Sequence, residues 1–288
     1  MEEPQPSASQ CVSLPHPTAG EQPAAMVERR LRHSMNRRGK RLAEEPGILG
    51  SIAQMLVERT REIHFSPAEA LDLGCRTGLV ARLLKEHWPQ MPVVSLMPTA
   101  ALPLARRATP LCLAGQLPRL PFANESFGLV VANSSLQWSG QLPLAMREVK
   151  RVMKKDGVLL CAVPGDENLL ELRQAMAETD RHFYGEEQPR VVAGYSIHTF
   201  GDALQGAGFS FPVADREQAH LTFPHLTALF ATLRRMGAAN PFPATPSLNR
   251  SYLRHLEEVY RHHFQQEGRL PLTVDILFGH GWKNPRPL

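Results

Sequence analysis

The stretch "ALDLGCRTGLVARLL", residues 70–84, decides the fold of this chain. It reads as a short strand ending near Leu73, then a glycine turn and a helix, and turns of this kind hold nucleotide-like cofactors. Gly74 and Gly78 let the backbone turn tightly and approach a ligand closely. Arg76 stands in the middle of the turn, where the geometry favours glycine. If the backbone there has a positive φ, a non-glycine residue costs on the order of 1 kcal/mol or more.

Strand and helix patterns alternate on both sides of this turn. Apolar residues recur at helical spacing before it, over residues 47–63, and a further helix is predicted to end at "KKDG", residues 154–157. The apolar stripe of that helix consists of Leu142, Ala145, Met146, Val149, Val152 and Met153. Other strand patterns occupy residues 91–97, 109–115, 129–132 and 158–164. The alternation predicts an α/β fold with a doubly wound, mostly parallel sheet, whose ligands bind at the carboxyl ends of the strands.

The pattern changes after Pro164. Helical patterns over residues 167–183, 195–209, 220–238 and 248–264 precede a closing strand near 272–279. We expect cap elements at about 166–260, placed over the strand ends, and a last strand that completes the sheet. Residues 1–25 contain five prolines, three glutamates and no lysine or arginine. They are expected to form a disordered tail, which leaves residues 26–288 as one domain.

Composition excludes several classes of protein. Apolar residues make up 43% of the 288 residues and charged residues 21%, which is enough to build a core. No apolar run reaches the ~18 residues needed to span a bilayer, so no membrane partner is expected. The first residues match neither a signal peptide nor a transit peptide. The four cysteines show no CxxC spacing, so we expect no metal site, reduced thiols and a cytoplasmic location.

Basic residues cluster near the N-terminus. The stretch "ERRLRHSMNRRGKRL", residues 28–42, contains six arginines and one lysine, although the net charge of the chain is only +4. It fits a solvated helix start, or a surface at residues 29–41 that docks an acidic carrier protein or another acidic protein. Nucleic acid is the weakest of the candidate partners, because no aromatic residues are interleaved for base stacking and no known nucleic-acid module is present.

Four segments in order, "LDLGCRTG", "VVSLM", "LPFANESFGLVVANSSLQW" and "REVKRVMKKDGVLL", resemble class I S-adenosylmethionine-dependent methyltransferases. The closing "GRLPLTVDILFGHGW" is similar to the malonyl-acyl-carrier-protein O-methyltransferases of biotin biosynthesis. A related branch, the methyltransferase-like arginine hydroxylases of respiratory complex I assembly, ends in a similar way. The resemblance implies a seven-stranded Rossmann-like sheet with a helical cap and a transferase that uses S-adenosylmethionine.

The resemblance also implies a set of cofactor-binding residues. These are Asp72, Gly74, Cys75, Arg76, Gly78, Met97, Gln116, Leu117 and Asn133. Asp72 and the two glycines match the family, and Asp72 is placed to orient the turn or to receive the amino group of the cofactor. Met97 and Gln116 replace carboxylates that would accept hydrogen bonds from the ribose and the adenine, and Gly128 replaces a further aspartate. Each lost charge-assisted bond costs roughly 1.5–3 kcal/mol, so we expect weak binding of S-adenosylmethionine.

The acceptor side gives fewer signals. Gln137 and Trp138 follow the fourth strand, where the family lines its methyl-transfer cleft, and His280 ends the last strand; simple packing is the alternative for all three. Methyl transfer to a carboxylate depends mainly on positioning, so no catalytic residue is assigned. An aromatic residue that the biotin branch carries in its N-terminal helix is missing, because all four tyrosines lie late in the chain. Two functions therefore compete: a methyltransferase, with a malonyl thioester as its possible acceptor, and a non-catalytic binding or assembly protein that has lost the cofactor.

Overall fold

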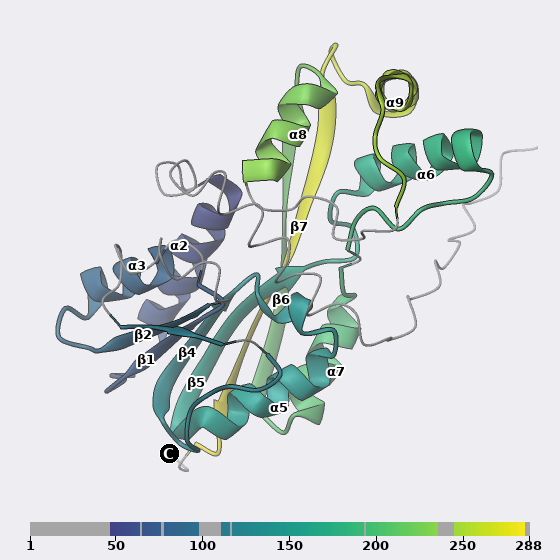
Figure 1. Ribbon diagram of the computed structural model, residues 1–288. Helices are drawn as coiled ribbons and strands as arrows, with labels where there is room; N and C mark the ends of the chain where they lie inside the picture. The colour runs from purple at the N-terminus through teal and green to yellow at the C-terminus, as the bar shows by residue number, and fades with distance from the viewer. Residues whose placement is uncertain are drawn as a thin grey trace, which may run out of the picture.

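The computed structural model describes residues 47–63, 65–75, 78–97, 111–115, 117–192, 194–235 and 245–285. These residues build a seven-stranded sheet with the strand order β3-β2-β1-β4-β5-β7-β6 (Figure 1). The strands are β1 (Ala70–Leu73), β2 (Val93–Met97), β3 (Cys112–Ala114), β4 (Phe127–Asn133), β5 (Met153–Pro164), β6 (Ser210–Phe223) and β7 (Leu270–Lys283). The predicted α/β class and the seven-stranded sheet are therefore confirmed.

Strands β1 to β5 are parallel, and β7 is antiparallel to both of its neighbours. Leu73 at the end of β1 lies beside Leu96 of β2, and Asn133 at the end of β4 lies beside Ala162 of β5. The carboxyl ends of the central strands therefore meet at one edge of the sheet, where parallel sheets bind ligands.

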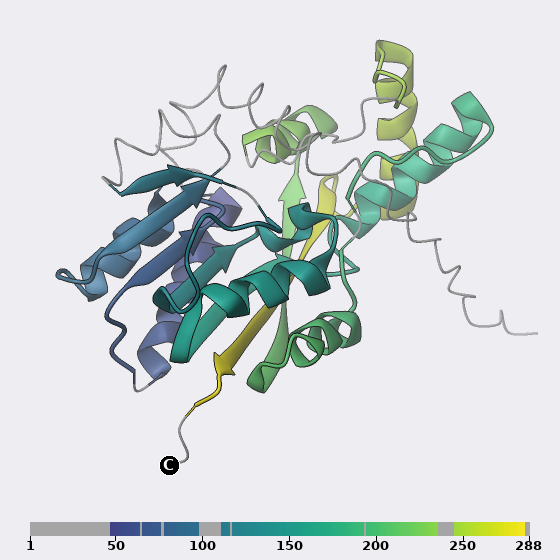
Figure 2. The same cartoon turned by 60° about the horizontal axis from the view of Figure 1, so that its bottom comes forward.

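Helices cover both faces of the sheet (Figure 2). On one face lie α2 (Gly47–Glu62) and α3 (Leu79–His87), which share an apolar core with β1, β4 and β5. On the other face lie α5 (Leu142–Val152) and α7 (Ile197–Gly206), which pack around Leu71, Val130 and Leu159. Burial on both faces explains why β2 and β4 contain no charged residue.

Strands β6 and β7 continue past the end of β5 and form a two-stranded arm. The last residue of β5, Pro164, pairs with Ile276 of β7. The residues of β7 that precede Ile276 pair with β6 alone. The arm carries α6 (Leu170–Tyr184), α8 (Leu226–Arg235) and α9 (Arg250–Phe264), which share a core of their own (Figure 1). A buried ion pair of Arg190 with Asp180, whose carboxylate also accepts a 2.8 Å bond from the Tyr252 hydroxyl, ties α6 to α9.

Three details differ from the sequence prediction. The predicted helix over 220–238 is helical only from Leu226, because its first residues belong to β6. Helix α5 ends at Val152, so the two lysines of "KKDG" lie in β5 and not in the last helical turn. The interval 166–260 is not a continuous cap, because α7 packs on the sheet and β6 joins it.

Several sequence predictions fall outside the described residues. They concern the tail at 1–25, the basic stretch at 29–41, Arg76 and Gln116. Among the residues that the structure does describe, no helix is both long and apolar enough to cross a membrane.

Candidate functional site

The turn after β1 needs glycine at two positions. Gly74 has φ 81° and Gly78 has φ 74°, a backbone region that L side chains rarely adopt. Gly74 is also in close contact with the loop after β4, because a Cβ there would lie 2.1 Å from Ser135 Cβ. Gly78 is the N-cap of α3, so it sets the direction in which that helix leaves the sheet. The sequence prediction that these glycines shape the turn is thereby given a physical cause.

Asp72, near the end of β1, bonds to residues of this turn and of its neighbours. Its carboxylate is buried and bonds to the Cys75 thiol, to the backbone N–H of Ala81 in the first turn of α3 and to Ser95. The backbone N–H of Gly78 in turn donates to Cys75 Sγ at 3.0 Å. Burial raises the pKa of Asp72 to about 6, even though these hydrogen bonds act in the opposite direction. The contacts fit the role of orienting the turn.

The loop after β4 is in contact with the turn after β1 through Ser135. Asn133 Nδ2 donates to the backbone oxygen of Leu49 at 2.9 Å, which ties the strand end to the start of α2. Ser134 has φ 49°, an uncommon conformation for a residue with a side chain. Ser135 Oγ donates to the backbone oxygen of Leu73 at 2.7 Å. This bond joins the ends of β1 and β4 directly.

A short 3-10 helix, η2 (Leu136–Ser139), follows and carries the two residues predicted for the cleft. Gln137 Nε2 donates to the backbone oxygen of Ser134 at 2.9 Å, but Gln137 Oε1 has no hydrogen-bond partner among the described residues. Trp138 Nε1 is likewise buried without a partner there. Most buried polar groups in folded proteins are hydrogen-bonded, so two exceptions on neighbouring residues are unusual.

Comparison with known proteins agrees with this geometry. The methyltransferase domain family matches residues 47–211, more than half of the chain. The chain belongs to the S-adenosylmethionine-dependent methyltransferase family. A malonyl-acyl-carrier-protein O-methyltransferase of Halorhodospira halophila is 34% identical over 269 residues, which cover 90% of this chain and 89% of that protein. The human mitochondrial arginine-hydroxylase NDUFAF5 is 29% identical and covers 81% of this chain and 68% of that protein.

Solved structures confirm the methyltransferase fold. The YcgJ protein of Bacillus subtilis has a TM-score of 0.55 at 14% identity and covers 81% of this chain and 98% of its own. A putative methyltransferase of Bacillus halodurans has a TM-score of 0.53 at 18% identity, covering 81% of this chain and all of its own.

The other predicted cofactor residues of this methyltransferase lie near the turn but point into the protein. Met97 ends β2 and is fully buried, and its backbone oxygen accepts a 2.9 Å bond from the N–H of Gly115. Leu117 packs in the apolar core with Leu71 and Leu96. Neither side chain supplies a strong hydrogen-bonding group to a ligand.

The structure places His280 in β7, on the level of Asp72 but three strands away from β1. Because β7 is antiparallel, its last residues lie toward the opposite edge, and His280 pairs with Leu160 of β5. By register this level continues through Val131 to Asp72. Burial lowers the pKa of His280, and the nearest charged groups that influence it are those of Asp215 and Arg59.

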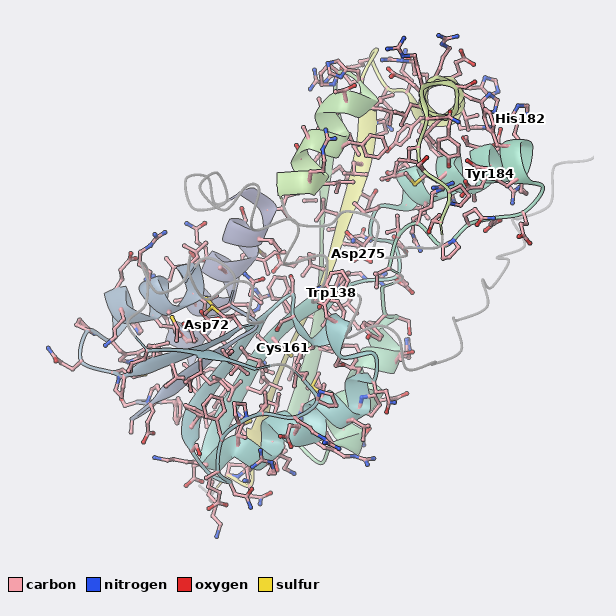
Figure 3. All side chains as sticks on the ribbon, in the orientation of Figure 1. Asp72, Trp138, Cys161, His182, Tyr184 and Asp275 are labelled. Atoms are coloured by element: carbon pink, nitrogen blue, oxygen red, sulfur yellow. The ribbon has the colours of Figure 1, made fainter. Side chains whose placement is uncertain are left out.

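Asp275 is a buried residue that the sequence reasoning missed. It lies on β7 where the arm leaves the sheet, and Figure 3 labels it between Trp138 and the helices of the arm. Its Oδ2 accepts the N–H of Glu167 at 2.9 Å, and its Oδ1 is 3.4 Å from Arg216 Nε. Burial raises the pKa of this carboxyl. A lone acid within the apolar run "LPLTVDILF" was a sequence signal that could have found it.

The described residues fit S-adenosylmethionine in shape more than in charge. Both glycines of the turn adopt the required backbone form, and η2 offers unpartnered polar atoms beside it. In the described part of the chain, no three His, Cys, Asp or Glu residues gather into a set that could hold a metal ion.

Proposed function

We propose that this methyltransferase transfers a methyl group to the free carboxylate of a malonyl thioester carried by an acyl carrier protein. The observation that carries the proposal is the 34% identity to a relative of that name over 90% of the chain. The match reaches beyond the common sheet into the arm, and the arm is the part of the chain most able to distinguish one acceptor from another.

The residues of this chain supply positioning. S-adenosylmethionine, when bound, supplies a methyl group on a positively charged sulfur. We assign its binding to the turn at Asp72, Gly74, Cys75 and Gly78, with Arg76, Met97, Gln116, Leu117 and Asn133 around it. A malonyl carboxylate is already ionised at neutral pH and needs no general base, so we assign no catalytic acid or base.

Binding of the cofactor is expected to be weak. Met97 is buried where a carboxylate would bond to the ribose hydroxyls, and a thioether is a poor acceptor. This same observation favours the alternative function, a methyltransferase-fold binding or assembly protein without catalysis. We also place the protein in the cytoplasm, because the four cysteines show no CxxC spacing and Cys75 and Cys161 are buried free thiols.

Calorimetric titration with S-adenosylmethionine and S-adenosylhomocysteine tests the cofactor site. We expect Met97→Asp to tighten binding by about tenfold or more, because a carboxylate regains charge-assisted bonds. Met97→Leu is the matched control and should leave the affinity unchanged. Micromolar affinity in the wild type without a gain from Met97→Asp would contradict weak binding. Absence of binding in both would favour the assembly function.

Methyl transfer to malonyl carrier protein tests the acceptor. We expect incorporation of labelled methyl groups with malonyl carrier protein but not with the acetyl form, which has no free carboxylate. Docking through Arg37 and Arg38 should weaken as salt rises, and reversal of both to glutamate should lower the association rate. An unchanged rate would remove the basic stretch from the proposal.

A further inference from the structure

Helix η2 holds one hydrogen-bond acceptor and one donor that nothing in the described protein satisfies. The orientation of the Gln137 amide follows from chemistry, because the backbone oxygen of Ser134 can only accept and therefore faces the nitrogen. Gln137 Oε1 is thereby left as an acceptor that needs a donor. Trp138 Nε1 is a donor only and needs an acceptor. Leaving such groups buried and unpaired costs about 1–3 kcal/mol each.

These two atoms are held in fixed positions. Ser139 Oγ donates to the backbone oxygen of Leu136 at 2.8 Å. The backbone N–H of Trp138, as distinct from its indole N–H, donates to the backbone oxygen of Ser135 at 3.2 Å. The strained Ser134 lies directly before the helix, and backbone strain of this kind concentrates at ligand sites. Gln137 and Trp138 are each partly exposed, whereas the two unpaired atoms themselves are buried.

The pair selects the chemistry of its ligand. A carboxylate offers only acceptors, so it would satisfy Trp138 and leave Gln137 unpaired. An amide offers both an N–H and a carbonyl oxygen, pointing in opposite directions. Water also offers a donor and acceptors, so the experiment has to separate these two ligands.

We propose that Gln137 and Trp138 bind amide groups of the pantetheine arm through which a carrier protein presents its acyl thioester. This inference rests on the proposed function and deepens it. The arm has an amide close to its thioester sulfur, and η2 lies directly after β4, beside the turn assigned to the cofactor. An amide held there would place the acyl group at the carboxyl edge of the sheet.

Two small acceptors isolate the amide. The malonyl thioester of N-acetylcysteamine contains it, and the malonyl thioester of ethanethiol does not. We expect the wild type to prefer the first by about tenfold in kcat/KM, the size of one or two good hydrogen bonds. Gln137→Met and Trp138→Phe should each reduce this preference, and the double variant should bring it close to one. The matched control is Gln205→Met, at an exposed glutamine of α7, and should keep the preference.

A binding measurement keeps the inference testable without turnover. The chain has three tryptophans, so the indole N–H resonance of Trp138 can be assigned by its loss in Trp138→Phe. Titration with pantetheine should shift this resonance in the wild type and less so in Gln137→Met. The affinity for S-adenosylhomocysteine should be the same in both, which would show that the turn is intact.

The outcomes separate the two proposals. Methylation of malonyl carrier protein with an equal preference for both thioesters, and no shift with pantetheine, would overturn the inference and leave the function standing. A pantetheine shift without methylation would overturn the function and keep the amide site. An equal loss of activity toward both thioesters in Gln137→Met would show that the pair holds only water or supports the fold.

Discussion

The turn after β1 and the loop after β4 meet at the same edge of the sheet, but they differ in how their polar groups are satisfied. In the turn, the Cys75 thiol bonds to the Asp72 carboxylate, and Cys75 Sγ also accepts the backbone N–H of Gly78. In the loop, Ser134 is strained, and Gln137 and Trp138 leave buried atoms without a partner among the described residues. Among the described residues of the turn, these polar groups are satisfied within the protein. The loop is incomplete, and a ligand that completes it would gain free energy from doing so.

The two regions are also joined at one point. Gly74 leaves the space that the Ser135 side chain occupies, and the Ser135 hydroxyl bonds to Leu73 at the end of β1. A change at this contact should therefore disturb both regions, whereas changes elsewhere should affect one of them.

The largest effect is expected from Gly74→Ala. The new Cβ would meet Ser135 Cβ at 2.1 Å, and the positive φ of 81° would add strain. We expect a loss of roughly 3–5 kcal/mol in the free energy of unfolding, measured by urea denaturation. Gly185→Ala is a matched control, because Gly185 has φ 79° but a Cβ at that position would meet no described atom within 4 Å. It should cost only about 1 kcal/mol.

A double variant separates contact from strain. Gly74→Ala with Ser135→Gly removes the clash and keeps the positive φ, so it should recover part of the loss. Equal losses in Gly74→Ala and Gly185→Ala, or no recovery in the double variant, would show that the two regions do not meet at this contact.

The second largest effect concerns Asp72 and pH. Burial raises the pKa of Asp72 to about 6 in the folded protein, above its ordinary value of 3.8. Between these two values the folded protein holds a proton that the unfolded chain releases. The contribution of Asp72 to the free energy of unfolding therefore falls as pH rises from 3.8 to about 6. The integrated loss is about 3 kcal/mol. Asp72→Asn cannot titrate, so its stability relative to the wild type should rise by up to that amount from pH 4 to pH 7.

Urea denaturation at several pH values between these limits measures the difference. Conversion of an exposed acid, Glu58→Gln on α2, serves as the control and should show a nearly flat difference. A flat profile for Asp72→Asn would mean that the carboxyl is solvated and does not close the turn.

The sequence was sufficient for the parallel half of the fold. Uncharged strands and helical stripes predicted β1 to β5 and the helices beside them, because burial on both faces leaves an apolar pattern. It was insufficient for β6, which lies at the edge of the sheet with most of its side chains exposed. Its charged run at Asp215, Arg216 and Glu217 shows no apolar alternation. An edge strand of this kind is defined by its partner β7 and not by its own pattern.

The candidate site shows the same division. The predicted parallel order places ligands at the carboxyl ends of the strands, where β1 and β4 end together, but it was the family resemblance that named Asp72, Gly74 and Asn133. The contact between Gly74 and Ser135 joins residues far apart in the chain, and no local pattern encodes it. The position of His280 depends on a contact of the same kind: the antiparallel direction of β7 places it beside Leu160 of β5, and the sequence does not state that direction.

The smallest effect should come from Ser134, and it has the opposite sign. Ser134 adopts φ 49°, so a side chain there is strained, while glycine is not. Ser134→Ala keeps the Cβ and loses the hydroxyl, which donates to Asn133 Oδ1 at 3.2 Å; Ser134→Gly loses both. The difference between the two variants therefore isolates the strain. We expect the glycine variant to be more stable than the alanine variant by about 1 kcal/mol in urea denaturation, slightly reduced by the greater freedom of glycine in the unfolded chain. The reverse order would show that the loop after β4 stores no strain. In that case only its unpaired atoms would distinguish it from the turn after β1.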